Sequence, residues 1–468
     1  MELALTGIDS IVMFQNSQAV KGRGTLVHIT RRVLVFEVYN PFSIVQVSEV
    51  LSDVKVVRGE QVIYNGKAVV SGIVTTGLMV IVSATLVDSW ADLTGLKPGK
   101  ALQSETKRFI KDWETSHDIE PSYQLVVSTL RSFLEELSKW LEGAEVGVFD
   151  STEAASVPSL KEEFYEEVVN PVAPKIVDLF GEFEQQASSI SPEQLVAHKA
   201  FARREIHPLT MCSPFVLRTY TKPLGYAGDY EMVNMMLYES SEVPANTYAK
   251  IVDAFHIQTA APEAHRNRIA MLRERLKEET SRVMNEGRPT SILNVGCGPA
   301  VEVQGFIREE EVSKHATFSL MDFSHETLEY AKRKIKGAVE ESSNKTMVKF
   351  VKKSIDELLK ESHEKSDSKP FAYDIVYSAG LFDYFPDHIC KQLVKLFYSW
   401  VRPGGLLTVT NVHPNNPNRY SMEHLLEWHL IYRDEKGMKD LIPPGCRQSE
   451  ISLDDTGINV FLDLRKEE

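Results

Sequence analysis

Cysteine is scarce in this sequence, and basic residues do not outnumber acidic ones. None of the four cysteines is near enough to another to form a Cys-x-x-Cys pair: Cys212, Cys297, Cys390 and Cys446. This usage predicts a reduced, cytoplasmic protein without a disulfide framework. The formal net charge of −14 argues against nucleic acid as a partner, because phosphate binding needs a basic surface.

Signals for export, metal binding and membrane insertion are also missing. The N-terminal segment lacks the charged-then-apolar order of a signal peptide, and no spacing such as His-x-x-His indicates a metal site. Residues 68–87 carry no charge and could span a bilayer as a helix. They are rich in Val, Ile and Thr, however, so we predict two strands with a turn near residues 75–77 and no membrane insertion.

The length of 468 residues predicts several domains. Residues 1–100 contain short apolar segments separated by turn signals such as Asn65-Gly66, a pattern typical of a small β-barrel. Residues 101–205 predict a helical connector or dimerisation region, because Leu130, Leu134 and Leu137 recur at helical spacing. A homodimer is therefore an expectation, beside plain packing within a helical bundle.

Residues 206–285 predict a substrate cap with further helices, and residues 286–468 alternate strands with helices. Such alternation is typical of a mostly parallel, doubly wound sheet. Two final strands, residues 447–453 and 458–464, predict an antiparallel hairpin that closes a seven-stranded sheet. The expected fold is thus a Rossmann-like α/β domain preceded by a helical region and a small β-barrel.

A glycine-rich turn is the strongest local signal. An apolar strand leads into Gly296 and Gly298, and a helix is expected next, so the backbone can approach a ligand closely there. Asp322 ends the next strand, where a carboxylate can accept hydrogen bonds from ribose hydroxyls. Ala300 stands where a dinucleotide motif has its third glycine, which favours a cofactor without phosphates.

These residues resemble a known family. Asn294-Val-Gly-Cys-Gly-Pro-Ala300 is similar to the first motif of class I S-adenosylmethionine-dependent methyltransferases, in which an acidic residue usually stands at the position of Asn294. Residues 320–324, 353–356, 373–378 and 401–406 resemble later motifs of the same family, in the same order. The resemblance implies a methyltransferase that uses S-adenosyl-L-methionine.

The resemblance also implies a set of cofactor-binding residues. Gly296 and Gly298 would lie under the methionine part, Asp322 would hold the ribose, and residues near the fourth strand would lie near the sulfonium. The full expected set is Asn294, Gly296, Gly298, Asp322, Phe323, Ser354, Ile355, Ser378, Gly380 and Leu381.

Residues 218–231 combine glycines, three tyrosines and both signs of charge, which indicates a binding loop; a buried turn is the alternative. This segment and residues 411–433 resemble bacterial methyltransferases associated with methyl esters of 3-hydroxy fatty acids. The expected substrate-binding residues are Arg218, Tyr220, Lys222, Asp229, Tyr230, Arg419 and Tyr420.

We therefore expect O-methylation of a small or fatty carboxylic acid. A carboxylate is already an anion and needs no base, whereas an amine or hydroxyl acceptor would need help from Tyr226, His413 or Asp383 as catalytic residues. A histidine on the surface is the alternative for His413. Two other functions stay open: a non-methyl use of the cofactor, such as cyclisation or group transfer, and a non-catalytic regulatory protein with a sensor barrel.

Residues 24–33 vaguely resemble the central strand of PilZ domains. His28, Thr30 and Val33 stand at the positions of the polar PilZ motif, and no paired-arginine motif precedes them. The comparison implies a degenerate PilZ-like barrel. We expect Arg31-Arg32 to be a solvated pair rather than a nucleotide site.

Overall fold

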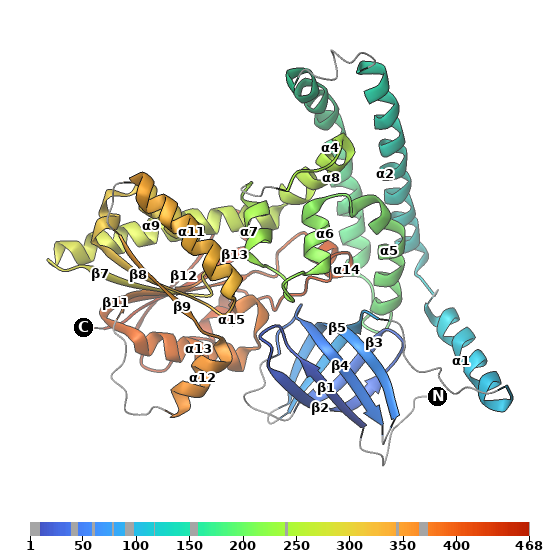
Figure 1. Cartoon of the computed structure of the whole chain (residues 1–468), viewed down its shortest axis with the longest axis horizontal. Coiled ribbons are helices and arrows are strands. Elements are labelled where there is room, and N and C mark those ends of the chain that lie inside the picture. Colours follow the sequence, from blue (N-terminus) through green and yellow to red (C-terminus); the bar gives the residue numbers. More distant parts are fainter. Residues whose placement is uncertain are drawn as a thin grey trace.

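A computed structural model describes most of the chain, in three connected parts (Figure 1). An N-terminal barrel and a C-terminal α/β domain both adjoin a helical region. The described residues are 10–38, 45–58, 61–76, 79–88, 98–116, 118–149, 158–238, 242–342, 346–364 and 373–467.

The barrel is closed and antiparallel, with the strand order β1-β2-β3-β6-β5-β4. Its side chains alternate between the interior and the surface, as a two-residue period requires: Leu34, Phe36 and Val38 of β3 are buried. The six strands are β1 (Ser10–Gln15), β2 (Lys21–Ile29), β3 (Val33–Val38), β4 (Val50–Arg58), β5 (Gln61–Thr76) and β6 (Met79–Leu86). The predicted barrel is therefore confirmed.

The expected turn at Asn65-Gly66 is wrong, because β5 runs through both residues. A Cβ atom on Gly66 would lie 2.5 Å from Oδ2 of Asp88, so close packing inside the strand explains this glycine. Within the uncharged segment, residues 68–76 and 79–86 form strands, as predicted, and Gly77 of the expected turn lies outside the described residues. Among the described helices, none has the length and apolar character needed to cross a membrane.

In the sequence, eight described helices come between the barrel and the sheet. Several begin at capping side chains: Ser213 accepts a hydrogen bond from Val216 N before α6, and Asn246 accepts one from Ala249 N before α8. The helices are α1 (Lys100–Ser116), α2 (Pro121–Val148), α4 (Pro158–Ser188), α5 (Leu195–Thr210), α6 (Pro214–Thr221), α7 (Tyr230–Met236), α8 (Thr247–Ile257) and α9 (Ala260–Asn285).

The predicted apolar stripe of α2 is buried, since Leu130, Leu134 and Leu137 pack into one core with α4 to α8. The same core includes Met422, Leu425 and Leu426 from near the C-terminus. The helical region and residues 419–430 thus form one packed cap over the α/β domain.

The α/β domain contains a seven-stranded sheet with the order β12-β13-β11-β10-β7-β8-β9. Only β13 pairs antiparallel with its neighbours β11 and β12, which confirms the predicted mostly parallel sheet with a closing hairpin. The strands are β7 (Thr290–Val295), β8 (Ala316–Asp322), β9 (Met347–Lys352), β10 (Tyr373–Ser378), β11 (Val401–Val412), β12 (Gln448–Leu453) and β13 (Asn459–Arg465).

Helices cover both faces of the sheet, as the crossover connections of parallel strands require (Figure 1). The helical elements of residues 301–439, of which α14 belongs to the cap, are α10 (Val301–Glu309), η1 (Glu311–His315), α11 (His325–Ser342), α12 (Ile355–Glu364), η2 (Phe382–Tyr384), α13 (Asp387–Trp400), α14 (Arg419–His424) and α15 (Glu435–Lys439).

Residues 47–50 of the barrel contact both of the other parts. Val47 N donates to Tyr384 O at 3.4 Å, Val50 N donates to Gly225 O at 2.8 Å, and Ser48 Oγ donates to His429 O at 2.9 Å. The barrel is therefore hydrogen-bonded to the cap and to the α/β domain.

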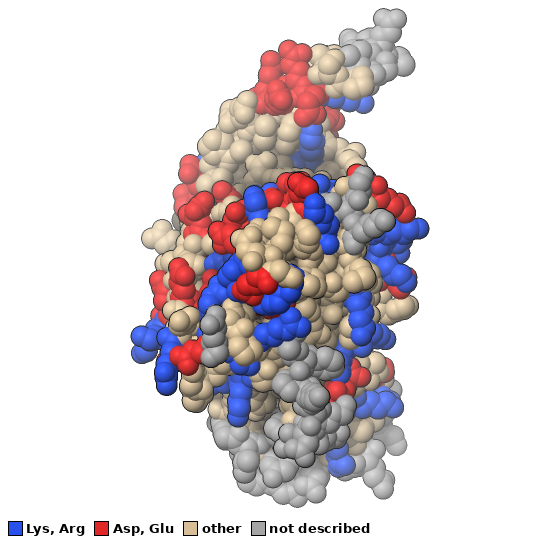
Figure 2. All heavy atoms as spheres, turned by 90° about the vertical axis from the view of Figure 1, so that its left-hand side faces the viewer, with Lys and Arg blue, Asp and Glu red and all other residues tan. Residues whose placement is uncertain are grey.

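Charges of both signs are interspersed over the face shown in Figure 2, with acidic side chains grouped toward one end of the molecule. This mixture differs from the continuous basic surface that nucleic-acid binding needs. The absence of a nucleic-acid partner stays a prediction.

The central sheet should control stability through its buried β13. Leu462 is fully buried between sheet and helices, whereas Leu453 on the neighbouring strand β12 is 39% exposed. Leu462→Ala should lower the free energy of unfolding by about 2–5 kcal/mol, because it removes apolar contacts and leaves a cavity. Leu453→Ala should change it by roughly 0.5 kcal/mol or less. Urea unfolding followed by circular dichroism measures both, and equal losses would contradict this account.

Candidate functional site

The glycine turn lies between β7 and α10. Gly296 and Gly298 adopt φ values of 72° and 52°, in the left-handed region that favours glycine. The amides of Gly296 and Cys297 donate to Met321 O at 2.9 and 3.0 Å, which ties the turn to the end of β8. No described heavy atom lies within 4 Å of the position that a Cβ on Gly298 would take, so the turn has an open side.

Asp322 is fixed against this turn. Its Oδ2 accepts a hydrogen bond from Gly298 N at 3.1 Å, and its Oδ1 accepts one from Ser324 N at 2.9 Å. Burial raises the pKa of the Asp322 carboxyl to about 6, above its ordinary value of 3.8. The sequence correctly placed this carboxylate at the end of the second strand of the sheet.

Two of the three tyrosines of residues 218–231, Tyr226 and Tyr230, cover the same region. The Tyr226 ring packs edge-on against Phe323, with centroids 5.1 Å apart. Tyr230 packs on Tyr330 at 4.6 Å, and its hydroxyl donates to Glu326 at 3.0 Å. Burial, followed by the charge of Asp322, raises the pKa of Tyr226 above its ordinary range, which does not suit a general base at neutral pH.

Asn294 stands where the resembling family has an acidic residue. In this protein, α10 supplies a carboxylate next to Asn294. Asn294 Nδ2 donates to Glu302 Oε1 at 2.9 Å and to the Tyr377 hydroxyl at 3.0 Å. Tyr377 in turn donates to Glu302 Oε1 at 2.7 Å. Asn294 Oδ1 is buried without a hydrogen-bond partner in the described chain. Glu302 was missed from the sequence, because it lies within the helix after the motif.

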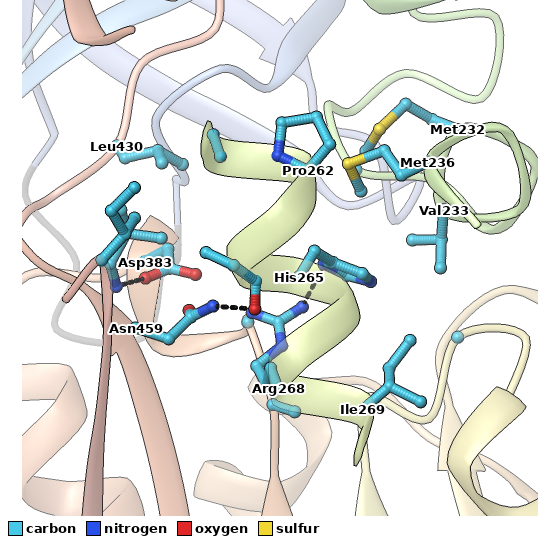
Figure 3. Close-up of a pocket in the computed structure, with 18 of the residues that line it drawn as sticks. Met232, Val233, Met236, Pro262, His265, Arg268, Ile269, Asp383, Leu430 and Asn459 are labelled. Atoms are coloured by element: carbon cyan, nitrogen blue, oxygen red, sulfur yellow. Dashed lines mark hydrogen bonds between the residues drawn. The ribbon is translucent and has the colours of Figure 1, made fainter. Parts of the chain in front are cut away.

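A cavity of about 190 Å³, here called the inner cavity, opens beside the glycine turn. One wall comes from the ends of parallel strands: Asn294, Gly296, Gly298, Gly380, Asp383 and Val412. The other wall comes from the cap and is mainly apolar: Phe180, Phe215, Met232, Met236, Phe255, Met422, Leu426, Trp428 and Leu430. Figure 3 shows Met232, Met236 and Pro262 on one side of this space and Asp383 and Leu430 on another.

A buried guanidinium reaches this apolar space. Arg268 of α9 is 7% exposed, and its Nη2 hydrogen-bonds His265 Nδ1 at 2.6 Å (Figure 3). Its Nε has no partner in the described chain, and none of the ion pairs found there includes it. Burial lowers the pKa of His265 well below its ordinary value, so the neutral ring can accept this bond. Gly380 leaves room for Arg268, since a Cβ there would lie 3.0 Å from Nη1.

Arg268 was also missed from the sequence. It shares one face of α9 with Leu272 and Leu276, at i, i+4 and i+8, and all three are buried. A charged residue in phase with an apolar stripe was the available signal.

The three expected catalytic residues are placed differently. Asp383 lines the inner cavity and accepts a hydrogen bond from Val412 N at 2.6 Å, and burial raises the pKa of its carboxyl. Tyr226 lies beside Asp322. His413 does not line the cavity: its Nδ1 accepts from Asn415 N at 3.0 Å and its Nε2 lies 3.3 Å from Glu435 Oε2.

None of the seven expected substrate-binding residues lines the inner cavity. Arg218 pairs with Asp229 at 2.9 Å, and Asp229 caps α7. Arg419 pairs with Glu423 at 2.8 Å. The charges of Arg218 and Arg419 are therefore already paired within the protein. Gly228 and Met232, near Arg218 in the sequence, do line the cavity.

The other expected substrate-binding residues also lie elsewhere. Tyr420 N donates to Glu184 at 2.8 Å, and Tyr230 contacts α11 as described above. Tyr220 and Lys222 line a second cavity, on the barrel side.

Among the remaining expected cofactor residues, Ser378 and Leu381 lie next to the glycine turn. Ser378 Oγ donates to Val295 O at 2.8 Å, and Leu381 lies about 3.7 Å from the position of a Cβ on Gly296. Ser354 Oγ accepts from Glu357 N at 3.2 Å at the start of α12, and Ile355 is buried there. No cluster of three metal-ligating side chains occurs among the described residues; the absence of a metal stays a prediction.

A family model described as "Methyltransferase domain" matches residues 287–449. No curated protein matches the chain. Among solved structures, a possible exported protein from Bordetella parapertussis is 17% identical, with a TM-score of 0.42, over 54% of this chain and 86% of that one.

Two further solved structures contain S-adenosylhomocysteine. The N-methyltransferase NodS from Bradyrhizobium japonicum is 12% identical over 45% of this chain and 90% of that one, with a TM-score of 0.30. The magnesium protoporphyrin IX methyltransferase ChlM from Synechocystis is 9% identical over 57% and 99%, with a TM-score of 0.34. With all three scores below 0.5, the assignment rests on the family match. Residues 287–449 are a methyltransferase domain, which confirms the predicted enzyme class and its cofactor, S-adenosylmethionine.

Proposed function

We propose that this protein methylates a carboxylate oxygen of a small or fatty carboxylic acid. The observation that carries the proposal is Arg268: a buried guanidinium, outside any ion pair found among the described residues, at a mainly apolar cavity beside the glycine turn. An arginine fork suits a carboxylate because it can donate two parallel hydrogen bonds. The Phe, Met and Leu side chains of the cap suit an alkyl chain.

The residues at the turn fit the cofactor. Gly296 and Gly298 leave room for its methionine part, and Asp322 presents a carboxylate for the ribose hydroxyls. Asn294 Oδ1 and the Glu302 carboxylate are acceptors for the α-ammonium group. Phe323, Ile355 and Tyr226 would flank the adenine, while Ser378, Gly380 and Leu381 would lie near the sulfur. When bound, the cofactor supplies an electrophilic methyl group on a sulfonium.

A carboxylate acceptor is ionised at neutral pH, so no residue has to remove a proton. The role of the protein is then to orient the acceptor and to exclude water. Arg268 orients the carboxylate. Asp383 acts as a positioning residue, because its negative charge attracts the Arg268 guanidinium. Asn418 Oδ1 and Asn459 Oδ1, both buried without a partner in the described chain and both at the cavity, can accept a hydrogen bond from a hydroxyl on the substrate.

These acceptors favour a 3-hydroxy fatty acid as the substrate, in agreement with the resemblance of residues 218–231 and 411–433. A cytoplasmic location and a homodimer through the helical region stay proposals. Light scattering at two concentrations tests the dimer.

The function is tested by incubating the protein with methyl-labelled S-adenosylmethionine and a panel of carboxylic acids that includes 3-hydroxy fatty acids. Mass spectrometry should find a labelled methyl ester and S-adenosylhomocysteine. Methyl label only on nitrogen or carbon acceptors would overturn the proposal.

Arg268→Gln should lower methyl transfer to the acid at least about tenfold, since a hydrogen bond to a charged group is lost. The affinity for S-adenosylhomocysteine, measured by calorimetry, should stay within about threefold. Arg282→Gln, near the other end of the same helix and paired with Glu279 and Glu286, is the control, with no effect on transfer expected. If Arg268→Gln instead abolishes binding of S-adenosylhomocysteine, then Arg268 holds the cofactor and not the acceptor.

Glu302 should hold the amino group of the cofactor. Glu302→Gln keeps the size of the side chain but removes its charge, so the affinity for S-adenosylhomocysteine should fall about tenfold or more. Glu309→Gln, at the exposed end of the same helix, is the matched control and should bind normally. If both variants bind S-adenosylhomocysteine with equal affinity, then Glu302 does not bind the cofactor and has a structural role only.

Asp322 predicts a pH dependence of cofactor binding. Because its folded pKa of about 6 lies above 3.8, the folded protein takes up a proton as the pH falls through 6. Protonation relieves the cost of burying the charge, so it stabilises the protein without cofactor, but it weakens the acceptor for ribose hydroxyls. Affinity for S-adenosylhomocysteine should therefore drop between pH 7 and 5 while the free protein does not lose stability from this group. Asp322→Asn should bind more weakly at pH 8 and show a smaller drop.

A further inference from the structure

The inner cavity follows one face of α9. Ala261, His265, Arg268 and Leu272 recur every three or four residues along this helix, and all of them line the cavity. Figure 3 shows Pro262, His265 and Arg268 in that order along α9. At a rise of about 1.5 Å per residue, the helix advances roughly 10 Å from Ala261 to Arg268. The cavity therefore extends along the helix.

The two ends of this space differ in polarity. Arg268 lies beside Asn459 and within reach of the negative charge of Asp383 (Figure 3). Toward the start of the helix, Met232 and Met236 line the cavity instead. A carboxylic acid is divided in the same way, into one charged group and an apolar chain. With the carboxylate at the guanidinium, the chain would run toward the start of α9.

Three aromatic rings line the cavity toward the start of α9. They belong to Phe180 of α4 and to Phe255 and His256 of α8. The ring centroids of Phe180 and Phe255 are 4.6 Å apart, those of Phe255 and His256 are 5.1 Å apart, and those of Phe180 and His256 are 5.6 Å apart. Each ring contacts the two others, so they form one surface, here called the aromatic floor.

The aromatic floor is fixed next to the first turn of α9. The helix that carries two of its rings, α8, ends at Ile257, and α9 begins at Ala260. Within this short connection, Thr259 Oγ1 donates to His256 O at 2.8 Å. Arg266 Nη1 donates to Ile257 O at 3.1 Å, which ties α9 to the end of α8. The floor thus lies at the end of the cavity that is away from the guanidinium.

The histidine of the floor is neutral, and the rings have packed core behind them. His256 Nδ1 donates to Val252 O at 2.8 Å, and burial lowers the pKa of His256. Phe180 belongs to the same buried core as Leu179 and Phe183. An alkyl chain that reaches the floor therefore meets apolar rings, and a longer chain would have to displace close-packed side chains.

Two independent measures give the length of chain that fits. An extended alkyl chain advances about 1.3 Å per carbon, because its bonds are about 1.5 Å long and alternate in direction. Roughly 10 Å along α9 then takes about eight carbons. The cavity volume of about 190 Å³ holds about six groups of the size of a water molecule, at about 30 Å³ each. Both values match a medium-length chain.

We propose that the aromatic floor of Phe180, Phe255 and His256 limits the acceptor to medium-chain carboxylic acids, of about eight carbons. This inference rests on the proposed function, since it takes the carboxylate to lie at Arg268. The three rings are then specificity-determining residues, and they act on the length of the chain and not on the chemistry of methyl transfer.

The test measures affinity against chain length by calorimetry, with the full-length protein in the presence of S-adenosylhomocysteine. The probes are butanoic, octanoic and dodecanoic acid. Affinity should rise from butanoic to octanoic acid, because each buried methylene strengthens binding about fourfold. It should fall at least about tenfold from octanoic to dodecanoic acid, because the excess chain overpacks the cavity.

Two variants move the floor in opposite directions. Phe255→Ala removes a partly buried ring, so dodecanoic acid should bind about tenfold more tightly than it binds the unaltered protein. Ala261→Phe fills the space in front of the floor, so octanoic acid should bind about tenfold more weakly while butanoic acid binds normally. Phe133→Ala is the matched control: Phe133 is partly buried in the same helical core but does not line the inner cavity, and its removal should leave the order of affinities unchanged.

The proposal is overturned if dodecanoic acid binds the unaltered protein as tightly as octanoic acid, or if Phe255→Ala and Ala261→Phe both keep the unaltered order of affinities. Formation of a labelled methyl ester is measured separately with the same acids. Binding with the expected length limit but without any ester would contradict the proposed function and still support the floor. Equal methylation of all three acids would support the proposed function and overturn the floor. If none of the acids binds, both are wrong.

Discussion

A buried guanidinium beside an apolar cavity is the constraint around which the site is arranged. An uncompensated charge away from water is costly, and the protein does not neutralise Arg268 with an ion pair among its described residues. It instead surrounds the group with partial compensation: a neutral histidine that accepts one hydrogen bond, and the more distant charges of Asp383 and Glu302. A bound carboxylate would compensate the rest of the Arg268 charge. The free energy that burial of the guanidinium costs would therefore contribute to the affinity for the acceptor.

The fold and the cofactor turn could be predicted from the sequence because both depend on local patterns. Gly296 and Gly298 record a backbone conformation, and Asp322 follows from the strand that ends there. The barrel and the closing hairpin follow from short alternating segments with turn signals. Asn65-Gly66 misled the prediction, since a glycine needed for close packing looks the same in sequence as one needed for a turn.

The contents of the cavities could not be predicted in the same way. Arg268 and Glu302 acquire their positions from tertiary packing; the local pattern shows only that Arg268 is in phase with the apolar stripe of α9. The polar residues 218–231 pointed to a binding loop, but charges in sequence do not show which are already paired. Arg218 and Asp229 form an ion pair with each other, whereas Gly228 and Met232 line the inner cavity.

The exchange of an acid for Asn294 has a physical consequence. A carboxylate on a strand end is fixed by the sheet, whereas Glu302 is carried by α10 and held by hydrogen bonds from Asn294 and Tyr377. Burial raises the pKa of Glu302, and the hydrogen bond from Tyr377 opposes the shift by stabilising the ionised form. Its charge is therefore most favourable when a cation is bound beside it. In the same way, the charge of Arg268 is most favourable when an anion is bound beside it. Glu302 therefore favours a cofactor with an ammonium group, and Arg268 favours an acceptor with a carboxylate.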